Sequence, residues 1–331
     1  MNNKEILITG GTGSLGTALT KLIRKKYEPK GIRIYSRSEL TQSKMIRDFN
    51  FNNPDGNKGI AYIVGDIRDR KSLERACSGV DIIINCAAMK RIDTCDENPL
   101  ECIKTNVNGT QNVVHAALLN DVEKVLHIST DKAVYPTTLY GSSKKCAEDL
   151  IKHANTYSGG RNPRFSCVRY GNVFGSNGSV VQIFQDQVKS HYDRSPITRE
   201  MPTPPTLTIT DQQMTRFWIG LKPVAKFILS CLTMLSGGEI FIPKMPSMSI
   251  MGLAKAVCPE AEFKFIGIRG QEKVHECLLT EEESRYTIEL NDRYCVTDSL
   301  HSLNTGVWKY LSNTNEWQLT RDELLKMLEE L

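Results

Sequence analysis

The sequence predicts an α/β fold in which a doubly wound parallel sheet is accompanied by a smaller α/β domain. Short apolar runs alternate with amphipathic helical stretches through the first half of the chain, as a parallel sheet requires. The runs are apolar along their whole length, which is typical of strands that helices cover on both faces. The expected strands are residues 5–8, 31–35, 61–64, 80–88, 124–129 and 164–170.

The composition is that of a globular protein with a large core: 331 residues, of which 40% are hydrophobic and 24% are charged. A net charge of +4 without a long basic run argues against nucleic-acid binding. The ten cysteines show neither a Cys-x-x-Cys pair nor zinc-like spacing, so we expect reduced thiols and no metal site. A strand begins almost at the N-terminus, and no apolar run reaches the roughly 18 residues of a membrane helix. We therefore expect a cytoplasmic protein without a membrane anchor.

A glycine-rich turn joins the first expected strand to a helix from Leu15 to about Lys26. Glycines at such a turn let a pyrophosphate approach the backbone at the helix N-terminus, which is the signature of a Rossmann-type dinucleotide site. The alternative is a helix-start loop that binds nothing. The residues expected to contact the cofactor here are Gly10, Thr12, Gly13, Ser14, Leu15 and Gly16.

The ends of the next strands indicate which dinucleotide binds. NAD-binding folds usually place an acidic residue after the second strand, whereas Arg37 suits the 2′-phosphate of NADP. An ordinary surface arginine is the alternative. Asp66 can accept a hydrogen bond from the adenine amino group, with Ile67 against the ring, and the small Ala87 lets the nicotinamide ribose lie close. We therefore predict NADP, held in part by Ser36, Arg37 and Ser38.

We expect Asn98-Pro99 to cap the helix that follows, and one polar residue of that helix has two interpretations. Asn106 lies among apolar neighbours. It could make a hydrogen bond inside its helix or contact the cofactor, and we include it among the candidate cofactor residues.

The chemistry is expected in the segment from Ser129 to Lys144. Its first part ends a buried strand, and its second part opens a helix on which Tyr140 and Lys144 share one face. An ammonium beside a phenol lowers the pKa of the phenol from about 10. That arrangement provides a base for an alcohol proton at neutral pH. In isolation Tyr-x-x-x-Lys is usually an exposed helix face, so the prediction depends on its position behind this strand and downstream of the glycine turn.

Three later segments differ from the strands and helices around them. Residues 171–179 are rich in glycine and asparagine and follow the strand at 164–170, at the C-terminal edge of the sheet. Residues 191–205 are polar and proline-rich, so we expect an exposed loop. Residues 263–276 concentrate charge in a turn-to-helix region where Arg269 could clamp a diphosphate. A solvated helix start is the alternative for this last segment.

Together these motifs resemble the extended short-chain dehydrogenase/reductases, and within them the inverting UDP-N-acetylglucosamine 4,6-dehydratases of pseudaminic acid synthesis. Asp131-Lys132 differs from the Asp-Glu of dTDP-glucose dehydratases, and Tyr140 differs from the methionine of membrane-bound dehydratases and 5-epimerases. The chain departs from the family at Gly270-Gln271, where Pro-Gly is usual, and in a longer loop at 191–204. The segments that carry the resemblance are 9–16, 35–37, 98–102, 129–133, 140–144, 169–173, 214–218, 237–248 and 266–276.

The resemblance implies a lyase whose cofactor ends as it began. Tyr140, assisted by Lys144, takes the C4 hydroxyl proton of the sugar while hydride passes to NADP. Lys132 then removes the C5 proton and Asp131 protonates the departing C6 hydroxyl, after which hydride returns to C6 and C5 is reprotonated with inversion. A base lysine needs a depressed pKa, whereas its adjacent carboxylate favours an ion pair, so the acid and base assignment stays open.

The resemblance also implies contacts to the substrate. Thr130 hydrogen-bonds the C4 oxygen. The residues expected to contact the UDP-sugar are Lys90, Asn172, Val173, Ser179, Arg216, Arg269 and Glu272.

The expected division of the chain follows the same resemblance. Residues 1–171, with later returns near 206–243, form the dinucleotide-binding domain, and residues 172–205 and 244–331 form the substrate-binding domain. Relatives form multimers, so a homo-oligomer that binds UDP-N-acetylglucosamine is expected. Two alternatives remain: a UDP-sugar epimerase or 5-epimerase of the same superfamily, and a non-catalytic NADP-binding relative.

Overall fold

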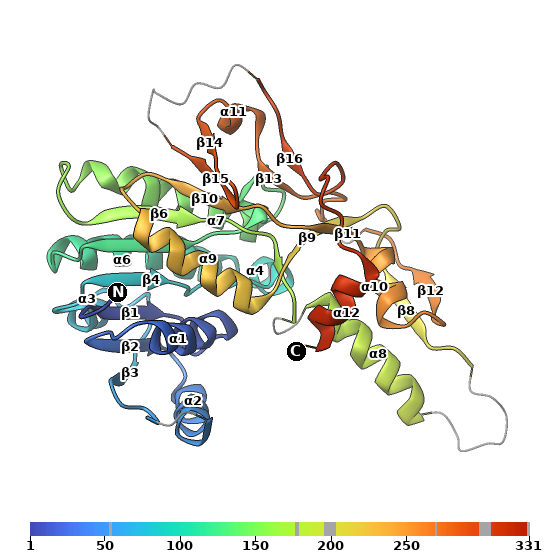
Figure 1. Ribbon diagram of the computed structural model, residues 1–331, viewed down its shortest axis with the longest axis horizontal. Coiled ribbons are helices and arrows are strands. Elements are labelled where there is room, and N and C mark those ends of the chain that lie inside the picture. Colours follow the sequence, from blue (N-terminus) through green and yellow to red (C-terminus); the bar gives the residue numbers. More distant parts are fainter. Residues whose placement is uncertain (53–54, 176–178, 195–202, 269, 298–305, 330–331) are drawn as a thin grey trace.

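A nine-stranded sheet organises most of the computed structural model, which describes residues 1–52, 55–175, 179–194, 203–268, 270–297 and 306–329 (Figure 1). Its strand order is β14-β15-β10-β6-β5-β4-β1-β2-β3. At one edge β15 (Arg293–Val296) runs antiparallel to β10, and β14 (Thr287–Glu289) runs antiparallel to β15. The parallel strands are β1 (Glu5–Thr9), β2 (Gly31–Ser36), β3 (Ile60–Val64), β4 (Ile82–Asn85), β5 (Lys124–Ile128), β6 (Arg164–Val168) and β10 (Ile240–Pro243).

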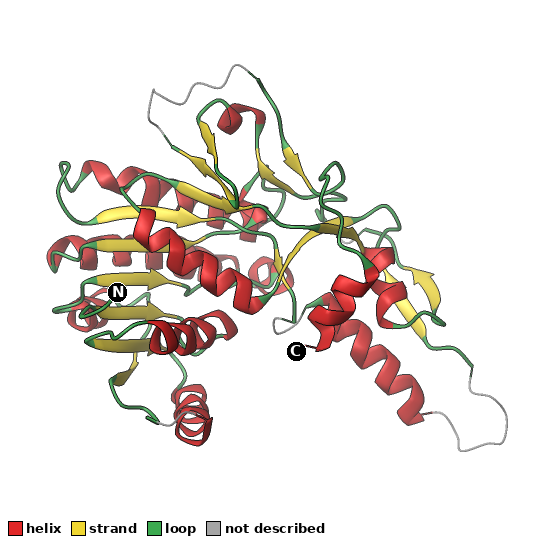
Figure 2. Cartoon of the chain, in the orientation of Figure 1, coloured by secondary structure: helices red, strands yellow, loops and turns green. Residues whose placement is uncertain are grey.

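Helices cover both faces of this sheet (Figure 2). On one face α1 (Ser14–Lys26) packs against α9 (Leu221–Met234). On the other face α6 (Gly109–Leu119) packs between α3 (Arg70–Cys77) and α7 (Leu139–His153). The doubly wound α/β fold predicted from the sequence is therefore confirmed.

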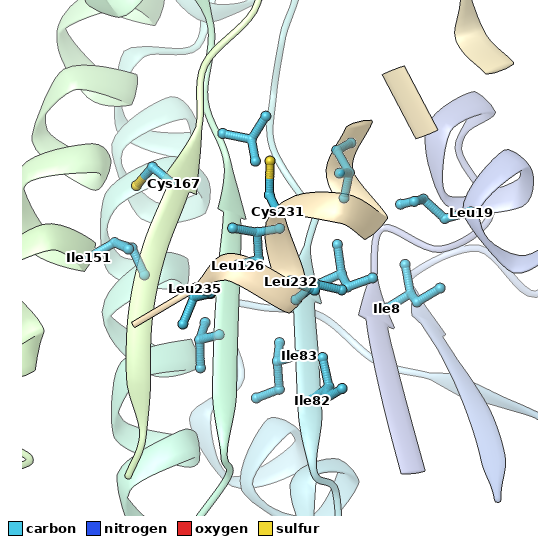
Figure 3. Packing of buried hydrophobic residues seen from close by; sticks show 14 of the residues in the cluster. Ile8, Leu19, Ile82, Ile83, Leu126, Ile151, Cys167, Cys231, Leu232 and Leu235 are labelled. Atoms are coloured by element: carbon cyan, nitrogen blue, oxygen red, sulfur yellow. The ribbon is translucent and has the colours of Figure 1, made fainter. Parts of the chain in front are cut away.

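The core explains why the strands are apolar along their whole length. Ile8 of β1, Ile83 of β4 and Leu126 of β5 are fully buried, and they lie with Leu19 of α1 and Leu232 of α9 in one continuous cluster (Figure 3). Each such side chain contributes about 1.5–3 kcal/mol when it is removed from water. Strands with both faces buried need no polar alternation.

Two of the three small sheets and three helices form the second, smaller α/β unit around a separate core that includes Phe174, Trp218 and Leu253. One sheet joins β7 (Asn172–Val173), β9 (Thr215–Ile219) and β11 (Ser247–Ser249). The other pairs β8 (Thr206–Ile209) with β12 (Glu262–Phe265). The third small sheet, β13 (Cys277–Leu279) with β16 (Tyr310–Leu311), instead contributes Leu278 and Tyr310 to the core of the large sheet. The helices are α8 (Val180–Arg194), α10 (Ile250–Val257) and α12 (Arg321–Glu329).

The remaining elements are short or flank the large sheet. They are α2 (Glu39–Asn52), α4 (Ile92–Glu97), α5 (Pro99–Ile103), the π-helix η1 (Lys104–Asn108), the 3₁₀ turns η2 (Asp131–Ala133) and η3 (Ala154–Thr156), and α11 (Glu281–Ser284).

Some local expectations were wrong. The start of the expected loop at 191–205 is the last turn of α8, because no glycine or proline interrupts that helix before Pro196. Among the described residues of 266–276 there is no helix: Gly267 and Gly270 have positive φ angles of 81° and 52°, which a helix does not allow. The Asn98 side chain does not cap α5; its amide donates to the Thr94 carbonyl instead.

The order of the parallel strands reverses at β1, which pairs with β2 on one side and β4 on the other. In doubly wound sheets this reversal opens a crevice at the carboxyl ends of the strands. The glycine turn after β1, the end of β4 and the turn after β5 meet at that edge.

A buried ion network ties this edge to β13 and α11. Arg169, directly after β6, has no exposed side-chain surface. Its Nε donates to Glu148 of α7 at 3.0 Å, its Nη2 donates to Glu148 and, at 2.7 Å, to Glu283 of α11, and its Nη1 donates to Glu283 and the Leu278 carbonyl, each at 2.9 Å. Glu148 also accepts from Ser129 Oγ at 2.7 Å. All five guanidinium N–H groups are thus satisfied.

Replacing Glu148 with glutamine should destabilise the protein by about 3–5 kcal/mol, because it leaves the Arg169 charge buried beside a single remaining carboxylate. Urea unfolding followed by circular dichroism measures the effect. The matched control is Asp149→Asn, which breaks an exposed ion pair with Lys145 on the same helix and should cost less than about 1 kcal/mol. Equal losses in the two variants would show that the buried network does not hold the fold.

Candidate active site

A cavity of about 1130 Å³ lies at the carboxyl ends of the parallel strands, between the large sheet and the second unit. A single small-molecule site typically measures about 300–1,000 Å³. The cavity therefore has room for two ligands side by side.

Most of the candidate residues from the sequence line this one cavity. Asp66, Asn106 and Asp131 do not line it, and Arg269 lies outside the described residues. The lining includes Gly10, Thr12, Gly13, Ser14, Leu15, Gly16, Ser36, Arg37, Ser38, Ile67, Ala87, Lys90, Thr130, Lys132, Tyr140, Lys144, Asn172, Val173, Ser179, Arg216 and Glu272.

The glycine turn is built for close backbone approach. Gly10 has a φ of +62°, and a Cβ there would lie 3.0 Å from the Cα of Ala87 at the end of β4. A Cβ on Gly16 would lie 2.5 Å from the Gly11 carbonyl oxygen, so only glycine lets α1 start against the turn. Gly13 is the N-cap of α1 without a side-chain cap, and the first turn carries no acidic residue. Free N–H groups at a helix N-terminus that opens into a cavity fit the diphosphate of a dinucleotide.

At the end of β2 and β3 the predicted residues divide into two groups. Ser36, Arg37 and Ser38 line the cavity. The Asp66 carboxylate instead accepts hydrogen bonds from the backbone N–H of Arg68 at 2.9 Å and from its guanidinium at 2.7 Å. Asp66 is therefore engaged by its own loop in this structure.

The structure assigns Asn106 a bridging role. Its amide nitrogen donates to the Met89 carbonyl at 3.0 Å and to Ser143 Oγ at 2.9 Å, and its Oδ1 accepts from the Met89 N–H at 2.8 Å. It lies in the π-helical turn η1, the kind of helix irregularity that often accompanies functional sites. Asn106 thus holds the loop after β4 against α7 from behind the cavity wall.

The expected lowering of the Tyr140 pKa by Lys144 was wrong for the protein without ligands. Burial raises the pKa of Tyr140 to about 12, although the Lys132 cation and a hydrogen bond with Thr130 act in the opposite direction. Lys144 Nζ lies 2.9 Å from His127 Nε2 and donates to the Ile128 carbonyl at 2.6 Å. Burial lowers the pKa of Lys144 to about 8, against the opposing effects of Cys167, Glu148 and Cys86. Lys144 is therefore a weakly basic amine rather than a firmly charged partner for the phenol.

The pKa of Lys132, which the sequence left open between a depressed value and an ion pair, is that of an ion pair. Its Nζ lies 3.0 Å from Asp131 Oδ1 and 3.5 Å from Glu276 Oε1, and it donates to Asn172 Oδ1 at 3.3 Å. Burial would lower the pKa of Lys132, but these two carboxylates outweigh burial and raise it above the ordinary value. In the protein without substrate, Lys132 is an ammonium in an ion pair.

Glu276 is the functional residue that the sequence reasoning missed. It is 3% exposed and lies 3.5 Å from Lys132, 3.7 Å from Arg216 Nε and 3.2 Å from Lys273. Burial would raise the pKa of Glu276, but the three cations lower it to about 2. The only signal in the sequence was the density of charge in 263–276, which did not distinguish this carboxylate from its exposed neighbours.

Several polar atoms in the cavity wall are buried without a hydrogen-bond partner among the described residues: Ser179 Oγ, Trp218 Nε1 and Glu272 Oε2. An unpaired buried polar atom costs about 1–3 kcal/mol. Their placement around the part of the cavity formed by the second unit fits a polar ligand that completes these bonds. The sequence indicated Ser179 and Glu272, but gave no reason to select Trp218.

Two further observations concern the described residues as a whole. None of their helices is long and apolar enough to span a membrane. They also contain no group of three or more His, Cys, Asp or Glu side chains placed to hold a metal ion.

Comparison with known proteins places the chain among enzymes of sugar-nucleotide chemistry. The family model described as polysaccharide biosynthesis protein matches residues 6–298. A UDP-N-acetylglucosamine 4,6-dehydratase (inverting) of Campylobacter jejuni subsp. jejuni serotype O:23/36 is 44% identical over 299 residues, which cover 90% of this chain and 84% of that protein. A UDP-glucose 4-epimerase of Rickettsia rickettsii is 38% identical over 311 residues, which cover 91% of this chain and 85% of that protein. The X-ray structure of Pen from Bacillus thuringiensis superimposes with a TM-score of 0.88 at 33% identity, covering 99% of this chain and 98% of that one.

Replacing Glu276 with glutamine should reduce stability at pH 7 and flatten its dependence on acid pH. The pKa of Glu276 falls from an ordinary 4.5 to about 2 on folding, so its charge contributes about 3 kcal/mol above pH 4.5 that is lost as the pH falls toward 2. Urea unfolding between pH 7 and pH 3 should therefore show a gap between wild type and E276Q that narrows below pH 4.5. The control is Glu281→Gln, an exposed carboxylate that pairs with Lys309. A gap that stays constant with pH would contradict the prediction.

Proposed function

The chain belongs to the polysaccharide biosynthesis protein family, and we propose that it is an NADP-dependent, inverting UDP-N-acetylglucosamine 4,6-dehydratase. It is a lyase that removes one water and yields UDP-2-acetamido-2,6-dideoxy-β-L-arabino-hexos-4-ulose. The observation that carries the proposal is the contact of Lys132 with Asp131 at 3.0 Å, on a turn that leads directly to Tyr140 in the cavity wall. An alcohol dehydrogenase needs only Tyr140 and Lys144; an elimination needs a second acid–base pair.

The glycine cradle at Gly10, Gly13 and Gly16 would hold the diphosphate of the dinucleotide, and Arg37 with Ser38 would hold the 2′-phosphate of NADP. When bound, the nicotinamide supplies a hydride acceptor at C4 of the sugar and a hydride donor at C6. The residues of this protein have to bind the nicotinamide and transfer the protons of the reaction.

Tyr140 takes the proton of the C4 hydroxyl. Because its pKa is about 12 in the free protein, Tyr140 is a neutral phenol there, so it accepts the C4 proton only as its own phenolic proton passes on. Lys144, whose pKa is about 8, is the acceptor on the same helix face. The Thr130 hydroxyl, which donates to Asp131 Oδ1 at 2.9 Å, orients the C4 oxygen.

The ion pair of Lys132 and Asp131 becomes the elimination pair by sharing one proton. Transfer from the ammonium to the carboxylate yields a neutral amine and a carboxylic acid, and this uncharged pair is favoured when a substrate expels water. The amine removes the C5 proton that the C4 ketone has acidified. The acid, which lies behind Thr130 and Lys132 and does not itself line the cavity, is the source of the proton for the departing C6 hydroxyl. Lys132 gains from C5 the proton that the pair loses through Asp131, so the ion pair is restored. C5 inverts when solvent delivers a proton to its opposite face, and the proton taken by Tyr140 and Lys144 returns to solvent.

Cationic side chains of the second unit would bind the UDP diphosphate. Arg216 is buried and donates to the Thr215 and Val274 carbonyls at 2.8 and 3.1 Å, which fixes its position. Burial lowers the pKa of Lys90 at the opposite wall. Asn172, Val173, Ser179 and Glu272 complete the proposed sugar-nucleotide site, together with Arg269 outside the described residues. The division into a dinucleotide domain and a substrate domain, and a homo-oligomeric assembly, belong to the same proposal.

A UDP-sugar 4-epimerase is the second candidate, since the chain is 38% identical to the Rickettsia epimerase. The products differ in mass: a dehydratase product is lighter than its substrate by one water, whereas an epimerase product has the mass of its substrate. Incubation with UDP-N-acetylglucosamine and NADP in D₂O, followed by mass spectrometry and NMR, should show loss of one water, deuterium at C5 and inverted C5 configuration. An unchanged mass with inverted C4 would identify an epimerase, and no turnover would indicate a binding protein.

Replacing Lys132 with methionine should reduce the rate of water loss by about 10²–10⁴-fold, the usual contribution of a general base. Isothermal titration with NADP should give the same dissociation constant as wild type within about twofold, because Lys132 lies away from the glycine cradle. Lys145→Met, which removes a half-exposed lysine of α7 outside the cavity lining, is the control. Loss of cofactor binding in K132M would identify Lys132 as a cofactor residue instead.

Replacing Arg37 with alanine should weaken NADP binding about 10–100-fold, since a charge-assisted contact to phosphate is worth about 1.5–3 kcal/mol. NAD binding should change less than about twofold. Arg47→Ala, an exposed arginine of α2 outside the cavity lining, serves as control. If R37A lost the same affinity for NADP and for NAD, Arg37 would not be the residue that discriminates between them.

A further inference from the structure

A row of buried polar side chains crosses the centre of the large sheet. Thr9 of β1 faces Asn85 of β4 in the strand register, and Asn85 faces His127 of β5. Thr9 Oγ1 donates to Asn85 Oδ1 at 2.6 Å, Asn85 Nδ2 lies 2.9 Å from His127 Nδ1, and His127 Nε2 lies 2.9 Å from Lys144 Nζ. Each of the four residues is at most 3% exposed. The row thus connects the glycine turn with the lysine of the proposed active site.

The hydrogen bonds of this row have a preferred direction. Thr9 Oγ1 accepts from the Ala87 N–H at 3.3 Å, and its own proton has Asn85 Oδ1 as acceptor. This fixes the amide with its NH₂ group toward His127 Nδ1. A neutral imidazole that accepts at Nδ1 carries its proton at Nε2.

The direction of these hydrogen bonds determines whether the neutral amine or the ammonium form of Lys144 fits beside His127. An Nε2–H group that points at Lys144 Nζ can only donate, and an ammonium has no lone pair to accept it. A neutral amine accepts this bond and still donates to the Ile128 carbonyl. Protonation of Lys144 requires the whole row to reverse, which leaves the Thr9 hydroxyl proton buried without an acceptor at a cost of about 1–3 kcal/mol.

The other groups that face Lys144 do not impose a charge on it. Glu148 of α7 is engaged by Arg169. Burial raises the pKa of Cys86 at the end of β4 to about 12, and raises the pKa of Cys167 of β6 well above its usual value, so both thiols are neutral. Burial and the neighbouring Lys144 hold the pKa of His127 well below its ordinary value. His127 is therefore a neutral ring. When Lys144 gains a proton, the tautomer of this ring changes and its charge does not.

We propose that His127 is a positioning residue for Lys144: through the Thr9–Asn85–His127 row it favours the neutral amine, and protonation of Lys144 is coupled to a change of the His127 tautomer. Resting on the proposed function, this makes Lys144 the acceptor for the proton that Tyr140 takes from the C4 hydroxyl. The reversal of the row then holds that proton on Lys144 until it returns to solvent at the end of the cycle. The coupling itself requires no substrate.

The first test reads the tautomer directly in the protein without ligands. Long-range ¹H–¹⁵N NMR of histidine-labelled protein distinguishes Nε2–H from Nδ1–H rings, and the His127 signals are assigned by their loss in His127→Gln. We expect Nε2–H above pH 9 and conversion to Nδ1–H as the pH falls, with a midpoint near the Lys144 pKa of about 8. The conversion should be absent in Lys144→Met. A tautomer that does not change with pH, a ring protonated at both nitrogens near pH 6.5, or a conversion that persists in K144M would overturn the proposal.

The second test uses turnover. In His127→Gln the amide oxygen can accept from an ammonium, so the bias toward the neutral amine is lost. The acid limb of the kcat profile should move to higher pH by about one unit, equivalent to a tenfold change in the protonation equilibrium. KM for UDP-N-acetylglucosamine and the Kd for NADP should stay within about threefold. His115→Gln, on α6 and outside the cavity lining, is the control. An acid limb that coincides with that of wild type would refute the positioning role.

The two tests separate this proposal from the proposed function. If the wild-type protein fails to remove water but its His127 tautomer follows Lys144, the function is wrong and the coupling stands. If water is lost while the tautomer is fixed, the function stands and the coupling is wrong.

Discussion

The buried salt bridges of Arg169 are the interaction on which the geometry of the site depends. The guanidinium lies at the end of β6 and is shared by Glu148 of α7 and Glu283 of α11, while Glu148 also holds Ser129 at the end of β5. One charge cluster therefore fixes the helix that carries Tyr140, the strand end that leads to Asp131, and α11. Buried charges contribute little net stability compared with apolar packing, but they penalise any arrangement that leaves one of them unpaired. That property suits a site that must hold groups from several elements in one geometry.

The two lysines of the proposed mechanism carry the same functional group, but their surroundings shift their pKa values in opposite directions. Lys132 and Lys144 are both withdrawn from water, and burial acts to lower the pKa of each. Lys132 has carboxylates at 3.0 and 3.5 Å, so Coulomb attraction prevails and it remains an ammonium. Lys144 faces a neutral ring and a carbonyl, so burial prevails. In the proposed mechanism Lys144 can therefore accept a proton from the substrate while Lys132 still carries its own. The two residues lie only twelve positions apart in the sequence.

Local chemistry made much of the fold and part of the site predictable. The glycine turn needs only its own strand and helix, and Thr130, Lys132, Tyr140 and Lys144 follow one strand end, so all of them reach the cavity as expected. The prediction for the pKa of Tyr140 failed because burial decides it. The pKa of Lys132 stayed open because a distant partner, Glu276, comes within 3.5 Å of Lys132 only in the folded chain. Asn106 was ambiguous because its partners, Met89 and Ser143, belong to a loop and a helix that no local pattern places beside it. The last turn of α8 was missed because polar composition was given more weight than the absence of a helix breaker.

The packing of the sheet does not require the polar row through Thr9, Asn85 and His127, so the row needs another explanation. The neighbouring residues Ile8, Ile84 and Leu126 are fully buried and apolar, so apolar side chains would also fill these three positions. A buried polar group is tolerated only when it is hydrogen-bonded. These three satisfy one another across adjacent strands in register and leave one end for Lys144. The strand register, which first serves the packing of the sheet, thereby also sets the surroundings of the lysine. The same row starts beside Gly10, so the turn that would receive the cofactor and the amine that would receive the proton share one continuous set of hydrogen bonds.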